Sequence, residues 1–280
     1  MIIAIFTNVV KNHSKPIAIA IREYLEGQNI QVVAEDVEAA SIGAKPLSSV
    51  PPASVDFIIT LGGDGTILRV FHTYPALDAP ILGINLGGLG FMADITIEDV
   101  YPCLESLLRK NYLVQNRMMM QGETMHHKSC FAINEIVIHR AHNPSLIDLA
   151  IYVDGNYLNT FSADGIIIAT PNGSTAYSLA AGGPILAPEL EAFVITPICP
   201  HTISNRPIVL MPKQEIQVRY ISEYESVEIT YDGFAHMAMH PGEVFRITRS
   251  PRKFRLVNML NYDFFATLRT KLGWTGKLKK

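Results

Sequence analysis

A glycine-rich loop that carries one carboxylate is the segment of this sequence whose residue types point most directly to chemistry. The loop Gly62–Gly65 (Gly-Gly-Asp-Gly) follows the apolar run Val55–Leu61 and precedes an apolar helix expected from Ile67 to about His72. Glycines let a backbone approach a phosphate closely, and free N–H groups at a helix start favour anions. Asp64 would repel a phosphate, so it would bind a hydroxyl, take a proton from one, or hold Mg²⁺. A tight turn with an exposed aspartate explains the same residues.

A second glycine-rich segment follows the next expected strand, Pro80–Asn85. Gly88 to Ala93 fits the pattern G-x-G-x-x-A, but no acidic residue stands where a dinucleotide fingerprint requires it. Turn-forming glycines explain the segment, and a loop beside Gly62–Gly65 would line the same crevice at the carboxyl ends of parallel strands. Gly-Lys-Ser/Thr does not follow the first loop, so its spacing is not that of a P-loop.

Two polar segments lie in apolar surroundings further along the chain. Asn134-Glu135 interrupts the strand-like run Cys130–His139, where a polar pair costs free energy unless it is hydrogen-bonded. It is a candidate for binding ribose hydroxyls, with a strand-edge pair as the alternative. Asp164-Gly165 precedes another apolar run, and Thr170–Ser178 then combines a turn, hydroxyl groups and a helix start. That segment could read an adenine edge, with Tyr177 as a stacking face, or it could be only a capped helix.

Composition and spacing argue against several classes of protein. The formal net charge of −3 over 280 residues argues against nucleic acid as the main partner. Three scattered cysteines without a C-x-x-C pair indicate reduced thiols of a cytoplasmic protein, not disulfides or a zinc site. The histidine pairs lack a third ligand, so they are not expected to form a metal site, and the site residues include no predicted metal ligand. No G-x-S-x-G supports a hydrolase. No apolar run reaches the roughly 18 residues of a membrane span.

The apolar pattern predicts an α/β domain followed by a β-rich one. Up to about residue 112, strand-like runs such as Ile2–Phe6 alternate with helical patterns such as 14–27, which predicts a Rossmann-like parallel sheet. Residues 41–54, rich in proline and serine, are expected to form a loop. Strand-like runs then follow one another, with a hairpin turn at Asp154-Gly155, which predicts a β-sandwich-like domain. The expected divisions are 1–112, 113–255 and a final helical segment, 256–280, that returns to the first domain.

Together these motifs resemble those of the NAD kinase family, ATP:NAD 2′-phosphotransferases, over nearly the whole chain and most closely in the bacterial branch. GGDG alone also occurs in diacylglycerol and sphingosine kinases, whereas the Asn-Glu pair and GSTAYS distinguish NAD kinases. The matching segments are Gly62–Thr66 (GGDGT), Gly83–Phe91 (GINLGGLGF), Asn134-Glu135, Asp164-Gly165, Thr170–Ser178 (TPNGSTAYS), Pro200–Pro207 (PHTISNRP) and Thr270–Trp274 (TKLGW).

The resemblance implies transfer of the γ-phosphoryl group of ATP to the 2′-hydroxyl of the adenosine ribose of NAD, in a cleft between the two domains. Asp64 would accept the proton, and Gly62, Gly63 and Gly65 would admit the phosphates. Asn134 and Glu135 would bind ribose hydroxyls, Thr175 and Ala176 adenine, and Asp164 would lie near nicotinamide. The full set implied to bind NAD is Asp64, Gly65, Phe91, Asn134, Glu135, Ser162, Asp164, Thr175, Ala176, Tyr177 and Ser178.

The resemblance also implies Mg²⁺ bridging ATP, NAD and ATP as the substrates, and a cytoplasmic homo-oligomer, commonly a tetramer, without nucleic-acid or membrane partners. Ser162 stands where many bacterial members have Arg, and Phe234 where related enzymes often have Gln, which affects the donor (ATP or polyphosphate) and the choice of NAD or NADH. Rival hypotheses are a lipid or sugar kinase, a nucleotide sensor, which would not need Asp64, and a dehydrogenase, which would need an early G-x-G-x-x-G.

Overall fold

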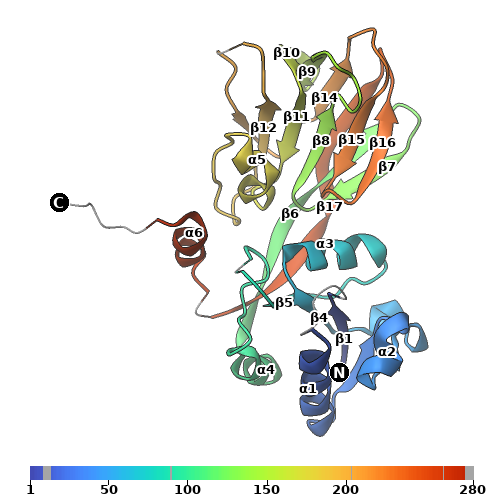
Figure 1. Ribbon diagram of the computed structural model, residues 1–280, viewed down its shortest axis with the longest axis vertical. Helices are drawn as coiled ribbons and strands as arrows, with labels where there is room; N and C mark the ends of the chain where they lie inside the picture. The colour runs from blue at the N-terminus through green and yellow to red at the C-terminus, as the bar shows by residue number, and fades with distance from the viewer. Residues whose placement is uncertain (9–13, 89, 203, 261, 275–280) are drawn as a thin grey trace, which may run out of the picture. The chain divides into compact units, whose positions relative to one another are not determined.

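The computed structural model describes residues 1–8, 14–88, 90–202, 204–260 and 262–274. They form two compact units, one of residues 1–115 with 255–280 and one of residues 116–254 (Figure 1). Two long strands, β6 (Tyr112–Thr124) and β17 (Val244–Met259), begin in one unit and end in the other. Of the segments singled out in the sequence, Leu89, Ile203, Asn261 and residues 275–280 lie outside the described residues. Within the described residues, no helix is long and apolar enough to cross a membrane.

The first unit is built on a parallel sheet in the order β3-β2-β1-β4-β5, and Leu256 of β17 continues it beside β5. Its helices alternate with its strands along the chain, as the hydrophobic pattern predicts. The strands are β1 (Ile2–Thr7), β2 (Gln31–Ala34), β3 (Lys45–Pro46), β4 (Phe57–Gly62) and β5 (Ile81–Asn85). The helices are α1 (Ser14–Gly27), α2 (Asp36–Ile42), α3 (Asp64–Thr73), α4 (Val100–Leu108) and α6 (Phe264–Leu272), with 3-10 turns at Leu47–Ser49 and Pro52–Ser54.

Helices cover both faces of the parallel sheet. α1 buries Ala18, Ile21 and Leu25 in one core cluster that also contains buried residues of α4 and of the strands. Figure 1 shows α3 on the opposite face of the sheet from α1 and α4. There α3 lies directly against β5, because a Cβ added to Gly83 would stand 2.9 Å from Cδ1 of Ile67. This close packing holds the N-terminus of α3 at the carboxyl edge of the sheet.

The second unit is a sandwich of antiparallel strands. One sheet has the order β13-β12-β11-β8-β15-β16, and the other contains β10-β9-β14-β17 with β6 and β7. Their facing side chains, among them Phe161, Phe193 and Phe245, form one buried cluster. The remaining elements are β7 (Ser129–Ala132), β8 (Glu135–His139), β9 (Ile147–Val153), β10 (Asn156–Ala163), β11 (Gly165–Ala169), a 3-10 turn at Gly173–Thr175, α5 (Tyr177–Ala180), β12 (Phe193–Ile198), β13 (Ile208–Leu210), β14 (Ile216–Tyr220), β15 (Val227–Tyr231) and β16 (Ala235–Met239).

The fold class predicted from the sequence is confirmed, and three local predictions are wrong. Residues 41–54 are not simply a loop, because α2 ends at Ile42 and β3 pairs with β2. α3 begins at Asp64 instead of Ile67, with Gly63 as its N-cap. The run Cys130–His139 is two strands, β7 and β8, separated at Ile133-Asn134. In the last two cases a polar residue with backbone partners decides where the element begins or ends.

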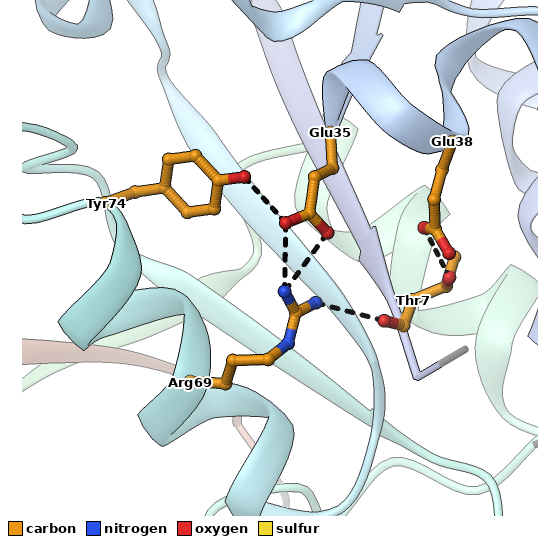
Figure 2. A network of polar contacts seen from close by, with 5 residues as sticks. All are labelled: Thr7, Glu35, Glu38, Arg69 and Tyr74. Carbon is orange, nitrogen blue, oxygen red and sulfur yellow. Dashed lines mark hydrogen bonds and ion pairs between the residues drawn. The ribbon is translucent and has the colours of Figure 1, made fainter. Parts of the chain in front are cut away.

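A polar network ties the first unit together at the carboxyl end of β1 (Figure 2). Arg69 of α3 donates Nη1 to both carboxylate oxygens of Glu35, at 3.0 and 3.1 Å, and Nη2 to the carbonyl of Thr7 at 3.1 Å. The hydroxyl of Tyr74 donates to Glu35 at 2.6 Å. Burial and the contact with the Glu35 carboxylate raise the pKa of Tyr74 to about 12. The network therefore connects α3 to β1 and to the start of α2.

Replacing Tyr74 by Phe should lower the stability of this unit. The substitution keeps the ring, which packs 5.1 Å from that of Phe6, but removes the hydrogen bond to Glu35. We expect a loss of about 1 kcal/mol and a lower thermal midpoint, measured by calorimetry. Tyr101→Phe on α4, where the tyrosine is 49% exposed, is the matched control and should leave the midpoint unchanged. Equal midpoints for the two variants would contradict the role assigned to the network.

Candidate active site

The carboxylate of Asp64 is held by three successive backbone N–H groups. β4 ends at Gly62 and α3 begins at Asp64, so this side chain lies in the first turn of the helix, where negative charge is favoured. Phe91 donates its N–H to Oδ2 at 2.9 Å, while Met92 and Ala93 donate to Oδ1 at 3.0 and 2.9 Å. The second glycine-rich loop therefore folds over the first one, as their positions after neighbouring strands predict.

The loop that binds Asp64 is itself fixed by Asn85 at the end of β5. The amide Nδ2 of Asn85 donates to the carbonyls of Gly88 and Ala93, at 2.7 and 3.1 Å, and its Oδ1 accepts from Gly87 N–H. Gly90 is required by close approach: an added Cβ would collide with Oδ1 of Asp64 and lie 2.7 Å from the carbonyl oxygen of Ala93. Only glycine therefore fits at position 90, beside the Asp64 carboxylate.

The two carboxylate oxygens of Asp64 accept different numbers of hydrogen bonds. A carboxylate offers about two lone-pair sites on each oxygen. Oδ1 accepts two N–H groups and Oδ2 accepts one, so among the described contacts Oδ2 retains a site for one more donor. A Cβ added to Gly63 or Gly65 would meet no atom within 4 Å, so there is open space beside the backbone of the loop. The arrangement can accept a hydroxyl proton beside a helix N-terminus that favours anions.

Phe91 lies between this loop and the C-terminal helix α6. Its ring is 6.3 Å from that of Phe264, and the Nζ atom of Lys271 stands 4.6 Å from the ring centroid. A cation over an aromatic face is attracted to it electrostatically. Because the N–H of Phe91 also binds Asp64, α6 supports the residue that orients the carboxylate.

In the second unit, the backbone of Asn134 and Glu135 is held on both sides. The buried carboxylate of Asp232 accepts the N–H groups of Ile133, Asn134 and Glu135, at 2.8, 2.7 and 3.2 Å. On the other side, Thr170 donates its hydroxyl to the carbonyl of Ile133 and its N–H to that of Asn134. These bonds explain the break between β7 and β8.

The side chain of Asn134 ends a buried chain of hydrogen bonds. Nδ2 of Asn172 donates to Oδ1 of Asn134 at 2.5 Å, and Nη1 of Arg117 donates to Oδ1 of Asn172 at 2.5 Å. Gly173, next to Asn172, packs so closely on Asn134 that an added Cβ would lie 2.8 Å from its Cα. The polar pair predicted from the sequence is therefore hydrogen-bonded, as its burial requires.

Glu135 is buried, with 7% of its surface exposed, and its Oε2 atom has no hydrogen-bond partner among the described residues. Burial first, and then the negative charge of Asp232, raise the pKa of Glu135 to about 8, against the opposing effect of the Tyr177 N–H. An unpartnered polar atom in such a position is costly unless a ligand satisfies it. Glu135 therefore combines burial, a raised pKa and an unpartnered oxygen, which are typical of a ligand-binding carboxyl group.

The remaining residues predicted from the sequence fall into two groups at opposite ends of β11. Near Asn134 and Glu135 are Thr175, Ala176, Tyr177 and Ser178; Thr175 donates to the carbonyl of Asn172, and Tyr177 is 47% exposed. Ser178 is fully buried and its hydroxyl bonds that of Thr196 at 2.9 Å. Ser162 and Asp164 precede β11, whose five residues separate the groups by roughly 15 Å.

At the start of β11, the two predicted residues Ser162 and Asp164 each have a polar partner within the protein. Ser162 donates its hydroxyl to Asp148. Asp164 forms an ion pair with Arg140, whose Nε is 2.8 Å from Oδ1. The structure therefore brings Asn134 and Glu135 together with the Thr175–Ser178 segment, and places Ser162 and Asp164 apart from them. Asp64, its glycines and Phe91 belong to the first unit.

The residues that orient Asn134 and Glu135 were not expected from the sequence; they are Asp232, Arg117 and Asn172. Asp232 follows β15 in the left-handed region, with φ 50°, and Gly233 after it has φ 66°, so the Asp-Gly pair signals a turn but not its contact with residues almost 100 positions away. Arg117 is only 2% exposed although it is charged, and it stands directly before the apolar run Met118–Met120. A lone charge beside such a run was the available signal.

Replacing Glu135 by Gln should flatten the dependence of stability on pH. The folded-state pKa lies above the ordinary glutamate pKa of 4.5, so the protonated form stabilises the fold. This contribution is complete below about pH 4.5 and is lost as pH rises through about 8, by an amount on the order of a few kcal/mol. Calorimetry between about pH 5 and 8 should show a smaller decline for Glu135→Gln than for the wild type. Glu223→Gln, at an exposed glutamate, should follow the wild type; a parallel decline in all three proteins would refute the assignment.

Two family models match this chain in succession. The model of the ATP-NAD kinase N-terminal domain matches residues 3–112, and that of the ATP-NAD kinase C-terminal domain matches residues 133–259. The NAD kinase of Protochlamydia amoebophila (strain UWE25) is 58% identical over 277 residues, which is 99% of each chain.

Solved structures agree with these sequence matches. Yeast NADH kinase complexed with NADH has a TM-score of 0.88 at 25% identity, over 100% of this chain and 89% of its own. An NAD kinase from Archaeoglobus fulgidus in complex with ATP has a TM-score of 0.76 at 27% identity, over 96% of this chain and 99% of its own. With both domain models matched in order and a relative this similar over nearly the full length, the chain belongs to the NAD kinase family.

Proposed function

We propose that this protein transfers the γ-phosphoryl group of ATP to the 2′-hydroxyl of the adenosine ribose of NAD, forming NADP and ADP, with Asp64 as the proton acceptor. The observation that carries the proposal is the Asp64 carboxylate at the start of α3, fixed by three backbone N–H groups with one lone-pair site left on Oδ2. The family membership supplies the reaction class.

In the first unit, Asp64 and the glycines around it would take part in the reaction. Oδ2 of Asp64 would take the proton of the 2′-hydroxyl. The hydroxyl oxygen would attack the γ-phosphorus of ATP as the bond from that phosphorus to the ADP oxygen breaks. Gly62, Gly63 and Gly65 would leave the backbone N–H groups at the start of α3 open to phosphate oxygens. Phosphoryl transfer depends mainly on in-line positioning and charge stabilisation, and a rigidly held base serves the first of these.

In the second unit, the separation of the two groups along β11 supports an extended dinucleotide as ligand. Asn134 and Glu135 would bind ribose hydroxyls, Thr175 and Ala176 adenine, and the exposed ring of Tyr177 would lie against the nucleotide. Asp164, with Ser162 nearby, would face the nicotinamide end, where Arg140 balances the charge of Asp164. Ser178 would act by orienting α5 through Thr196, and Phe91 would pack against NAD from the first unit.

Mg²⁺ would accompany ATP and supply charge neutralisation at its phosphates. Because Mg²⁺ is commonly bound through substrate phosphates, the phosphate oxygens of ATP would be among its ligands. Among the described residues, no group of three histidine, cysteine or acidic side chains is placed to hold a metal ion. We further propose a cytoplasmic homo-oligomer, a tetramer as in the family. Large apolar side chains exposed on the single chain support such association: Met211 is 55%, Leu260 58% and Phe265 63% exposed.

Replacing Asp64 by Asn tests the reaction and the base together. Purified protein is incubated with NAD, ATP and Mg²⁺, and NADP is measured with an NADP-specific dehydrogenase; NADH and polyphosphate are run in parallel as alternative substrates. Because the amide cannot take the proton, kcat should fall by about 10²–10⁴ while the Kd for NAD, measured by calorimetry, changes little. Turnover of Asp64→Asn within a few-fold of the wild type would reject Asp64 as the proton acceptor. A wild-type protein that is inactive with every substrate pair would favour a nucleotide sensor.

Gly90→Ala and Gly88→Ala test the positioning of Asp64 with a matched pair of substitutions. The Cβ at residue 90 would displace the Asp64 carboxylate, whereas a Cβ at residue 88 would meet no atom within 4 Å. We expect kcat to fall by about 10² in Gly90→Ala and to stay within a few-fold in Gly88→Ala, since misplacing a reacting group by about 1 Å has effects of that size. Similar turnover in the two variants would show that the contact with Gly90 does not set the position of the base.

A further inference from the structure

Arg117 fixes the direction of every hydrogen bond in the buried chain that ends at Asn134. A guanidinium group has donors only, so the atom of Asn172 that faces it must be the oxygen, which lies 2.5 Å from Nη1. The amide nitrogen of Asn172 must then face Asn134 and donate, so the facing atom of Asn134 is its oxygen, again at 2.5 Å. The N–H groups of Asn134 Nδ2 take part in none of the hydrogen bonds between the described residues. The end of Asn134 that remains for a ligand is therefore a donor.

We propose that Arg117 and Asn172 are positioning residues that make Asn134 a hydrogen-bond donor to a hydroxyl oxygen of the NAD ribose. The inference rests on the proposed function and deepens it, because it assigns the polarity of the contact and the residues that set it. It concerns only side chains of the second unit, which the structure places within one compact body.

The neighbouring carboxyl group explains why this polarity matters. Glu135 follows Asn134 in the chain, is equally buried, and has its Oε2 atom without a partner. A ribose hydroxyl has one hydrogen to donate and an oxygen that accepts. If an ionised Glu135 takes the hydrogen, the second contact must come from a donor, and Asn134 Nδ2 is that donor. An oxygen in its place would compete with Glu135 for the single hydrogen.

The backbone of Asn134 and Glu135 is held by hydrogen bonds, which limits how far the two side chains can move. Asp232 binds the three N–H groups of residues 133–135, and Thr170 binds the carbonyls of Ile133 and Asn134. The close contact of Gly173 with Asn134 removes the remaining space on that side. The charges around the pair are Glu135 itself and Asp232, with Arg117 linked through Asn172. The orientation of the Asn134 amide is thus set by bonding and not by local flexibility.

Asn172→Asp inverts the polarity without changing the shape of the side chain. One oxygen of the new carboxylate would still accept from Arg117, and the other would face Asn134 and force its amide to turn, which points an oxygen at the ligand. Asn134→Asp places an oxygen at the same point by a direct change. The buried ion pair with Arg117 keeps Asn172→Asp compatible with folding, and the second variant provides the test if the first one does not fold.

Binding of NAD is measured by calorimetry without ATP at about pH 9, above the pKa of Glu135, and NADP formation is measured in parallel. We expect Kd and KM for NAD to rise by about tenfold or more in both variants, as for the loss of one hydrogen bond, while KM for ATP stays within about two-fold. A Kd for NAD equal to that of the wild type in a folded Asn172→Asp protein would overturn the inference and leave the proposed function intact. A wild-type protein that forms no NADP would overturn the proposed function itself.

Two substitutions of Arg117 separate its directional role from a purely structural one. Arg117→Lys keeps a donor-only group facing Asn172, so Kd for NAD should stay within about two-fold of the wild type. Arg117→Met has similar volume but no donor, so it removes the constraint that Arg117 places on the orientation of Asn172, and Kd should rise several-fold. The thermal midpoint is recorded for each protein. Equal weakening by Lys and Met would show that the donor character of Arg117 is irrelevant and would reject the proposal.

Discussion

A carboxylate that accepts three consecutive backbone N–H groups occurs once in each unit, and the candidate functional residues of that unit depend on it for their positions. Asp64 binds the N–H groups of residues 91–93 in the first unit, and Asp232 binds those of residues 133–135 in the second. Backbone N–H groups that leave a strand must find other partners, and an ionised acceptor is the strongest available. Each aspartate therefore stabilises an irregular segment that carries the functional groups.

Asp64 and Asp232 form the same kind of hydrogen bonds but have different roles. Asp64 keeps one acceptor site on Oδ2, so its loop orients a group that can itself react. Asp232 is buried and supports the backbone of its neighbours, while its charge contributes to the raised pKa of Glu135. Gly90 serves the first arrangement, because a Cβ there would collide with the Asp64 carboxylate and the carbonyl of Ala93. Gly173 serves the second, because a Cβ there would collide with the backbone of Asn134. These close contacts keep the Asp64 carboxylate and the Asn134-Glu135 pair in fixed positions.

Much of the fold could be predicted from hydrophobic periodicity, and the exceptions have a common cause. The strands β1, β5, β9, β11 and β15 and the helix α1 follow from their apolar patterns. The break at Ile133-Asn134 and the start of α3 at Asp64 do not, because polar contacts between distant residues decide them. α2 is short and lies next to the segment 41–54 that was expected to be a loop. β17 is long because strands of both units pair with it.

The sequence by itself determined the class of fold, the family and the residue types of the candidate site, since these depend on apolar periodicity and on short motifs that are contiguous in the chain. Only the tertiary structure decided which atoms of those residues keep unused hydrogen-bonding capacity among the described contacts: Oδ2 of Asp64, Nδ2 of Asn134 and Oε2 of Glu135. The direction of a hydrogen bond depends on what faces each group: Arg117 and Asn172 set it for Asn134, and the N–H groups of residues 91–93 fill the other acceptor sites of Asp64. These partners are distant along the chain, so contiguous motifs do not reveal them.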